Sequence, residues 1–188
     1  MSTEVLVLGA ILTALVIVLQ LMGSFIRIGS MFSISLVLVP IVIGAAKCGI
    51  KISTWLGFVF GVAVLLSGDA AAFLAVDVFG TIVTVLLKGA ACGFAAGVVY
   101  RVLSKYNVYV AVVAAAIVCP IVNTGLFLLG CLVFFMDTVK AWGEAAGIAN
   151  AASYMLLYLV GGNFLFELGA NIVLSPVIVR LLNLSKKN

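Results

Sequence analysis

Long apolar stretches separated by short polar breaks run from one end of the chain to the other. A transmembrane helix needs about 20 mainly apolar residues, because it rises about 1.5 Å per residue across a hydrocarbon layer of about 30 Å. Six stretches approach or exceed this length, and they predict six membrane-spanning helices. Their bounds are Val5–Ile26, Ile28–Ala46, Ile52–Gly68, Val78–Tyr100, Val108–Met136 and Asn163–Leu182. The expected fold is therefore an all-α membrane protein, a six-transmembrane-helix bundle in a single domain covering residues 1–188.

Prolines and glycines add local detail to these spans. Pro40 and Pro120 predict kinks in the second and fifth spans, because proline removes one backbone hydrogen bond from a helix. Gly161 and Gly162 predict a break between a short interfacial helix and the sixth span. Polar connections are expected at residues 68–77, 101–107 and 137–144.

The composition supports the membrane assignment. Hydrophobic residues make up 66% of the chain and charged residues only 9%, whereas soluble domains are about 45–50% apolar and about 25% charged. The first stretch is expected to be a span and not a signal peptide, because the first positive charge comes only at Arg27 and the stretch is too long for a typical signal sequence. The net charge of +4 is spread over short loops, so no nucleic-acid partner is expected.

The charged residues of the loops predict the orientation. With six spans both termini share one side of the membrane, and Arg27 and Lys140 fall on the other side. The side of the termini collects seven basic residues, which are Lys47, Lys51, Arg101, Lys105, Arg180, Lys186 and Lys187. Cytoplasmic loops carry the excess of Lys and Arg, so both termini are predicted to be cytoplasmic.

One charged residue lies deep inside the fourth span. Lys88 shares a helical face with Thr81 and Thr84, at the spacing i, i+3, i+7. Counted from Val78, it lies roughly 15 Å into the membrane at 1.5 Å per residue. Intramembrane charges are costly and usually mark functional sites. Lys88 is therefore a candidate for ligand binding, and a pairing with a carboxylate for packing alone is the alternative.

Two more polar groups lie in the later spans. Asn163, Glu167 and Asn171 follow one another at i, i+4, i+8 on the sixth span, and Asn123 and Thr124 follow the fifth-span proline. Each set fits either a ligand site or hydrogen bonding between helices. An ion pair between Lys88 and Glu167 would satisfy both charges and leave neither free for a substrate.

Small residues form a further pattern. The glycines at 57 and 61 on the third span and at 89, 93 and 97 on the fourth have GxxxG spacing, which predicts close packing of helices inside the bundle. Ala10 and Ala14 form a small-xxx-small pair on the first span. This pair fits either internal packing or a docking surface for another membrane protein.

The chain lacks the residues that several classes of function need. The chain has no histidine and no GxxxxGK[ST] phosphate loop, so it is expected neither to hydrolyse ATP nor to carry out Ser-His or Cys-His catalysis. Its four cysteines have no metal-ligand spacing. The sequence therefore predicts no enzyme activity, no metal site and no cofactor. An oligomeric pore-forming or structural membrane protein remains a rival class.

The chain resembles the substrate-binding S components of energy-coupling factor (ECF) vitamin transporters along essentially its whole length. The features that carry the resemblance are Ala10-xxx-Ala14, Lys88-Gly89, Asn123-Thr124-Gly125, Asn163-xxx-Glu167 and Ser175-Pro176. The resemblance implies a location in the bacterial plasma membrane and an outward-opening pocket built by spans four to six. It also implies two kinds of partner, a membrane-embedded coupling protein and two cytoplasmic ATPase subunits.

The convergence of polar faces on three helices predicts roles for the site residues. Lys88 is expected to pair with a substrate carboxylate, Asn123, Thr84 and Asn163 to hydrogen-bond the substrate, and Glu167 to orient Lys88 or accept a substrate hydroxyl. Thr81 and Thr124 complete the expected substrate-binding set, and the resemblance implies that Ala10 and Ala14 are the docking face for the coupling protein.

The substrate is predicted from the same helices. The pattern is nearest to pantothenate-type and folate-type members, whose substrates are carboxylates and which usually carry arginine near the position of Lys88. Few aromatic residues are expected on the pocket face, although Phe73, Phe79, Phe164 and Phe166 are available. Pantothenate is therefore the first candidate, with riboflavin, folate or another vitamin as alternatives.

Overall fold

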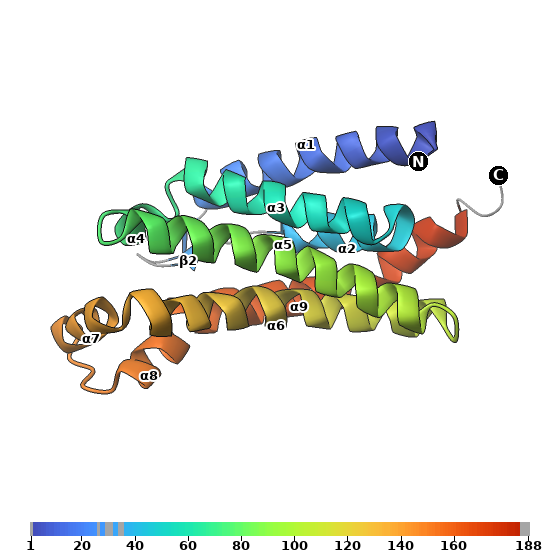
Figure 1. Ribbon diagram of the computed structural model, residues 1–188. Helices are drawn as coiled ribbons and strands as arrows, with labels where there is room; N and C mark the ends of the chain where they lie inside the picture. Colours follow the sequence, from blue (N-terminus) through green and yellow to red (C-terminus); the bar gives the residue numbers. More distant parts are fainter. Residues whose placement is uncertain (1, 26, 29–31, 34–35, 185–188) are drawn as a thin grey trace.

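The computed structural model describes residues 2–25, 27–28, 32–33 and 36–184, and it places long helices side by side in a bundle (Figure 1). The five longest are α1 (Thr3–Phe25), α3 (Ile50–Ser67), α5 (Val78–Leu103), α6 (Val108–Phe134) and α9 (Gly161–Leu184). A shorter helix, α2 (Leu38–Cys48), is enclosed by the others. Each of the five long helices is apolar and long enough to cross a membrane. This confirms the predicted class, an all-α membrane bundle.

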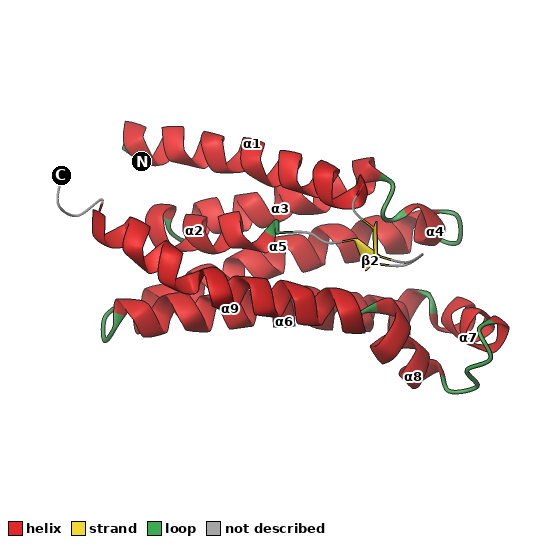
Figure 2. Cartoon of the chain, turned by 180° about the vertical axis from the view of Figure 1, so that it is seen from behind, coloured by secondary structure: helices red, strands yellow, loops and turns green. Residues whose placement is uncertain are grey.

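The short elements add a cap to one end of the bundle. They are the two-residue strands β1 (Arg27–Ile28) and β2 (Phe32–Ser33), the helices α4 (Ala71–Leu74), α7 (Met136–Ala145) and α8 (Ala151–Tyr154), and the π-helical segment η1 (Met155–Leu159). The strands pair antiparallel. Figures 1 and 2 show α4, α7 and α8 together at one end, whereas both termini lie at the opposite end.

The second helix is shorter in the structure than the predicted span. Among the described residues of the predicted helix Ile28–Ala46, only those from Leu38 onwards are helical, while Arg27–Ile28 pairs antiparallel with Phe32–Ser33. The 11-residue helix α2 has a length of about 16 Å, half of what a membrane crossing requires. Pro40 therefore lies in the first turn of α2, where a missing N–H costs nothing, and produces no kink in a long helix.

Other boundaries differ less. Residues 137–144, predicted as a polar loop, belong to the helix α7. The predicted short helix before the last span exists as α8 and η1. The break lies at Val160, directly before the two glycines, so α9 begins at Gly161 and not at Asn163. Pro120 lies inside α6 as predicted.

The glycines of α3 and α5 pack the two helices against each other, as predicted. A Cβ atom added to Gly57 would meet the backbone carbonyl of Gly89, and one added to Gly93 would meet the carbonyl of Ser53. The two backbones are thus close enough that no side chain fits between them. This contact fixes α5, which carries Lys88, against the rest of the bundle.

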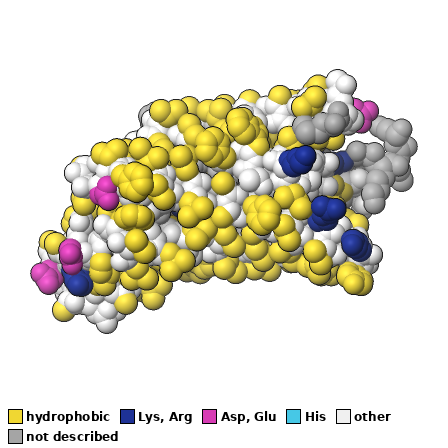
Figure 3. Space-filling model, viewed as in Figure 1, with side chains coloured by type: hydrophobic (Ala, Val, Ile, Leu, Met, Phe, Trp, Pro, Cys, Tyr) yellow, Lys and Arg dark blue, Asp and Glu magenta, His cyan; other side chains and the backbone are white. Residues whose placement is uncertain are grey.

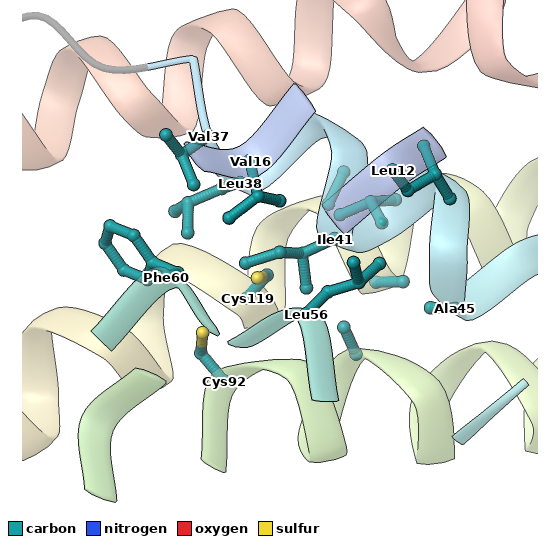
Figure 4. Close-up of a cluster of buried hydrophobic side chains, with 14 of the residues drawn as sticks. Leu12, Val16, Val37, Leu38, Ile41, Ala45, Leu56, Phe60, Cys92 and Cys119 are labelled. Atoms are coloured by element: carbon teal, nitrogen blue, oxygen red, sulfur yellow. The ribbon is translucent and has the colours of Figure 1, made fainter. Parts of the chain in front are cut away.

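The main hydrophobic core lies between α1, α2, α3, α5, α6 and the last part of α9. Figure 4 shows Ile41 of α2 beside Leu56 of α3, with Cys119 of α6 and Cys92 of α5 in the same cluster. All four side chains are fully buried. The short helix α2 thus fills the interior of the bundle at the end of the termini.

Charged side chains divide between the two ends of the molecule. In Figure 3, Lys and Arg side chains gather mainly at the end that carries the termini, and acidic side chains lie mostly at the other end. At that acidic end, Lys140 pairs with Asp137 on α7 at 3.6 Å. The distribution agrees with the positive-inside argument for cytoplasmic termini.

Candidate functional site

A cavity of about 760 Å³ opens within the end of the bundle capped by α4, α7 and α8. Its volume falls within the range of about 300–1,000 Å³ that is usual for small-molecule sites. Seven polar residues from three helices line it: Thr81, Thr84 and Lys88 from α5, Asn123 and Thr124 from α6, and Asn163 and Glu167 from α9. These seven residues, called the polar cluster below, are the predicted substrate-binding set.

Helical spacing explains why the polar cluster converges. Asp77 caps α5 by accepting a hydrogen bond from the Gly80 amide at 3.0 Å, which fixes where the helix begins. Thr81, Thr84 and Lys88 then follow on the face that lines the cavity. On α9, Asn163 lies one turn before Glu167, and its Nδ2 donates to Glu167 Oε1 at 3.3 Å.

Lys88 and Glu167 do not form an ion pair. Among the described residues, no carboxylate oxygen lies within 4.0 Å of Lys88 Nζ. The ammonium group lies instead 5.2 Å from the ring centroid of Phe127 and 5.7 Å from that of Phe60. Cation–π contacts of this kind stabilise a desolvated ammonium by about 2 kcal/mol, while leaving its hydrogen-bond donors available.

Several buried polar atoms of the cluster have no hydrogen-bond partner within the described part of the chain. They are Thr84 Oγ1, Asn123 Oδ1, Asn163 Oδ1 and Glu167 Oε2. The side chain of Glu167 is only 4% exposed. A buried polar group without a partner costs about 1–3 kcal/mol. Four such atoms beside one cavity mark a place where a bound molecule would supply the missing partners.

The aromatic lining of the cavity contradicts the expectation of few aromatic residues. Seven rings line it, and they are called the aromatic wall below: Phe60, Phe73, Phe127, Phe135, Trp142, Tyr154 and Tyr158. Phe73 was among the four named candidates, whereas Phe79 and Phe166 are exposed on the outside and Phe164 does not belong to the lining.

The sequence pattern could have predicted one ring of the aromatic wall, but not those of the short helices. Phe127 follows Asn123 by four residues, so the spacing that groups the polar residues also places this ring in the cavity. Trp142, Tyr154 and Tyr158 come from α7, α8 and η1. These elements are too short for hydropathy to place them.

At the cavity, a hydrogen bond connects α1 to the segment that follows α3. Gln20, near the end of α1, donates a hydrogen bond from Nε2 to Asp69 Oδ2 at 2.7 Å. Both residues line the cavity, although neither was predicted as a site residue. Because Gln20 lies 49 positions from Asp69, sequence spacing carries no sign of this contact.

Ala10 and Ala14 lie away from the cavity, on the outer surface of α1. Both are exposed, while Leu12 and Val16 on the other side of the helix are buried in the core. Their exposure favours the docking interpretation over internal packing, and the docking role itself stays a prediction.

Membrane-length helices around a ligand-sized cavity define a multi-pass membrane protein with a candidate small-molecule site. The family model described as "ECF transporter, substrate-specific component" matches residues 4–179. The chain belongs to this family, and with its five membrane-length helices it is a multi-pass protein of the bacterial cell membrane. No curated protein and no solved structure matches the chain.

Proposed function

We propose that this chain captures a small water-soluble vitamin from outside the cell and holds it in the cavity between α5, α6 and α9. One observation carries the proposal. Polar residues from three helices, far apart in sequence, line a single cavity and include two charges that do not pair with each other. The family supplies the broader role, a substrate-specific subunit of a transporter.

The residues of the polar cluster take separate roles in this proposal. The ammonium of Lys88 pairs with an anionic group of the substrate, since its hydrogen-bond donors are not engaged by a carboxylate of the described residues. Asn123, Thr84 and Asn163 form hydrogen bonds to the substrate through atoms that have no partner among the described residues. Glu167 accepts a hydrogen bond through Oε2.

Two kinds of substrate fit these roles. Pantothenate combines a carboxylate for Lys88 with hydroxyl groups for Glu167, and it is the candidate indicated by the polar faces of α5 and α9. The second kind is a vitamin with an aromatic ring, such as riboflavin or folate. The sequence predicted few aromatic residues in the pocket, but the aromatic wall supplies rings on which such a vitamin can stack.

Delivery into the cell is proposed to require partners. The family description names a substrate-specific component, which implies that energy comes from other subunits, a membrane-embedded coupling protein and two ATPases. Ala10 and Ala14 form the proposed contact with the coupling protein, because their small, exposed side chains allow another helix to approach α1 closely.

Isothermal titration of the purified protein against a panel of vitamins tests the proposal. We expect one panel member to bind saturably with one site per chain. A folded protein that binds no member would refute the proposed function and favour the rival class, an oligomeric pore-forming or structural membrane protein.

A further inference from the structure

The cavity has two chemically different parts. Phe73 of α4 is the centre of the aromatic part, since its ring meets Phe127, Phe135 and Trp142 edge-on at centroid distances of 5.5, 5.1 and 5.3 Å. Beside them Tyr154 and Tyr158 stack at 5.7 Å with an interplanar angle of 12°. The other part is the polar cluster.

The aromatic wall is larger than an aliphatic ligand needs. Apolar burial alone is served equally well by aliphatic side chains, whereas aromatic rings favour other rings by about 0.5–1.5 kcal/mol per pair beyond the buried area. The wall is assembled from five separate elements, α3, α4, α6, α7 and the α8–η1 segment, with Phe135 at the junction of α6 and α7. Five of these rings also pack on one another in a second hydrophobic cluster, so the wall is an aromatic surface formed without a ligand.

Glu167 defines the polar part. Its Oε1 already accepts a hydrogen bond from Asn163, while its Oε2 and the Oδ1 atoms of Asn123 and Asn163 have no donor among the described residues. Three acceptor oxygens clustered around one carboxylate call for a group that offers several N–H or O–H donors. Lys88, on the facing helix, calls for an acceptor or an anion on the same molecule.

We infer that the ligand is a planar aromatic nitrogen heterocycle held by the aromatic wall. Its N–H groups donate hydrogen bonds to Glu167, while an acceptor group on the same molecule meets Lys88. This inference rests on the proposed function and narrows its substrate class. It assigns specificity to Glu167 and to Trp142, neither of which is required to recognise a simple carboxylate.

The two tryptophans of the chain provide the test. Trp142 lines the cavity, whereas Trp55 is 50% exposed on α3 and donates a hydrogen bond to Thr13 of α1 at 3.3 Å. The variant Trp55→Phe leaves Trp142 as the single reporter, and Trp142→Phe leaves Trp55 as the matched control. The probes are riboflavin, folate, thiamine and pyridoxine, with pantothenate and biotin as vitamins that lack an aromatic ring.

We expect one heterocycle to bind at least about tenfold more tightly than pantothenate and biotin, and to quench Trp142 much more strongly than Trp55. Tighter binding of pantothenate or biotin than of every heterocycle would overturn this inference and leave vitamin capture intact. If no probe binds to a protein that still unfolds cooperatively, both the inference and the proposed function fail.

The role of Glu167 has its own variants. Glu167→Gln replaces one acceptor by a donor, so it should weaken binding of the heterocycle by about tenfold or more. Asn171→Leu is the control, because Asn171 lies one turn further along α9, is 1% exposed and is outside the cavity lining. Unchanged affinity in a folded Glu167→Gln protein would overturn the assignment, and the Trp142 measurement remains decisive if that variant does not fold.

Discussion

The charge of Lys88 lies in the membrane-spanning part of α5 without a carboxylate partner among the described residues. A lysine at the centre of a transmembrane helix costs about 2.5–3.5 kcal/mol on insertion scales. Phe60 and Phe127 offset part of this cost through their ring faces. The remaining cost is explained if the ammonium serves to bind an anionic or strongly accepting group.

Replacing Lys88 tests this interpretation. Lys88→Ala should weaken binding of a carboxylate vitamin by about 10- to 150-fold, since a hydrogen bond to a charged group contributes about 1.5–3 kcal/mol. Binding of an uncharged vitamin should fall less, because its acceptor group lacks the negative charge that pairs with the ammonium. Isothermal titration provides the measurement, and Lys140→Ala on the outer helix α7 provides the control, because that lysine is exposed and pairs only with Asp137 among the described residues. Equal loss of affinity in both variants would contradict a specific role for Lys88.

The sequence could predict which polar residues share a helical face, but not which residues from distant segments lie beside them in the cavity. Regular helical spacing determines which residues of α5 and α9 share a face, so Thr84, Lys88 and Glu167 were found without a structure. Contacts such as Gln20 to Asp69 depend on how α1 meets the segment after α3. The substrate-binding role of all these residues stays a prediction.

Among the helices, α3 and α5 approach each other most closely, and only glycine fits at their contact. Gly93 faces the Ser53 carbonyl of α3, whereas a Cβ on Gly125 of α6 would meet nothing within 4 Å among the described residues. The two glycines therefore have different reasons to be present, although each lies inside a long apolar helix.

The pair provides a stability test. Gly93→Ala should destabilise the protein by about 1–3 kcal/mol, because the added methyl group forces two backbones apart. Gly125→Ala should be neutral or stabilise by up to about 1 kcal/mol through helix propensity. Thermal unfolding in detergent measures both. A Gly93→Ala protein as stable as the parent would contradict the packing.

The outer surface of α1 makes a separate prediction. Bulky side chains in the double variant Ala10→Trp, Ala14→Trp should strongly reduce vitamin uptake into cells, because they block close approach of another helix. Substrate binding to the purified variant should be unchanged, since neither residue lines the cavity. Val173→Trp, at an exposed position of α9, is the control. Normal uptake by the double variant would refute the docking surface.

The elements differ in how far sequence determines them. Long apolar runs predicted six spans, and five of them are helices of membrane length, because hydropathy and length alone decide that a helix can cross a membrane. The length of the second helix was overestimated, because an apolar run can also belong to a short helix buried inside a protein. In this chain α2 is surrounded by other helices and so needs no membrane length. The helix α7 was missed because its polar residues resemble those of a loop.

For the whole molecule, the separation of charge between the two ends predicts an orientation in the membrane with both termini in the cytoplasm (Figure 3). Tyr106 is 86% exposed in the turn between α5 and α6, at the end of the termini, and Ala149 is exposed in the segment between α7 and α8 at the opposite end. Single cysteines at these two positions would report on opposite sides of the membrane.

Labelling of these cysteines tests the orientation. In a background without the four native cysteines, Ala149→Cys should react with an impermeant maleimide on intact cells. Tyr106→Cys should react only after the membrane is opened. The reverse pattern would place the termini outside and would direct the cavity toward the cytoplasm.

The most direct test of vitamin capture is an experimental structure of the purified protein with its bound vitamin. We predict that the ligand lies in the cavity between α5, α6 and α9, with an acceptor group at Lys88 Nζ and a donor group at Glu167 Oε2. A ligand bound elsewhere, or a bound state in which Lys88 and Glu167 pair with each other and leave the ligand untouched, would contradict it.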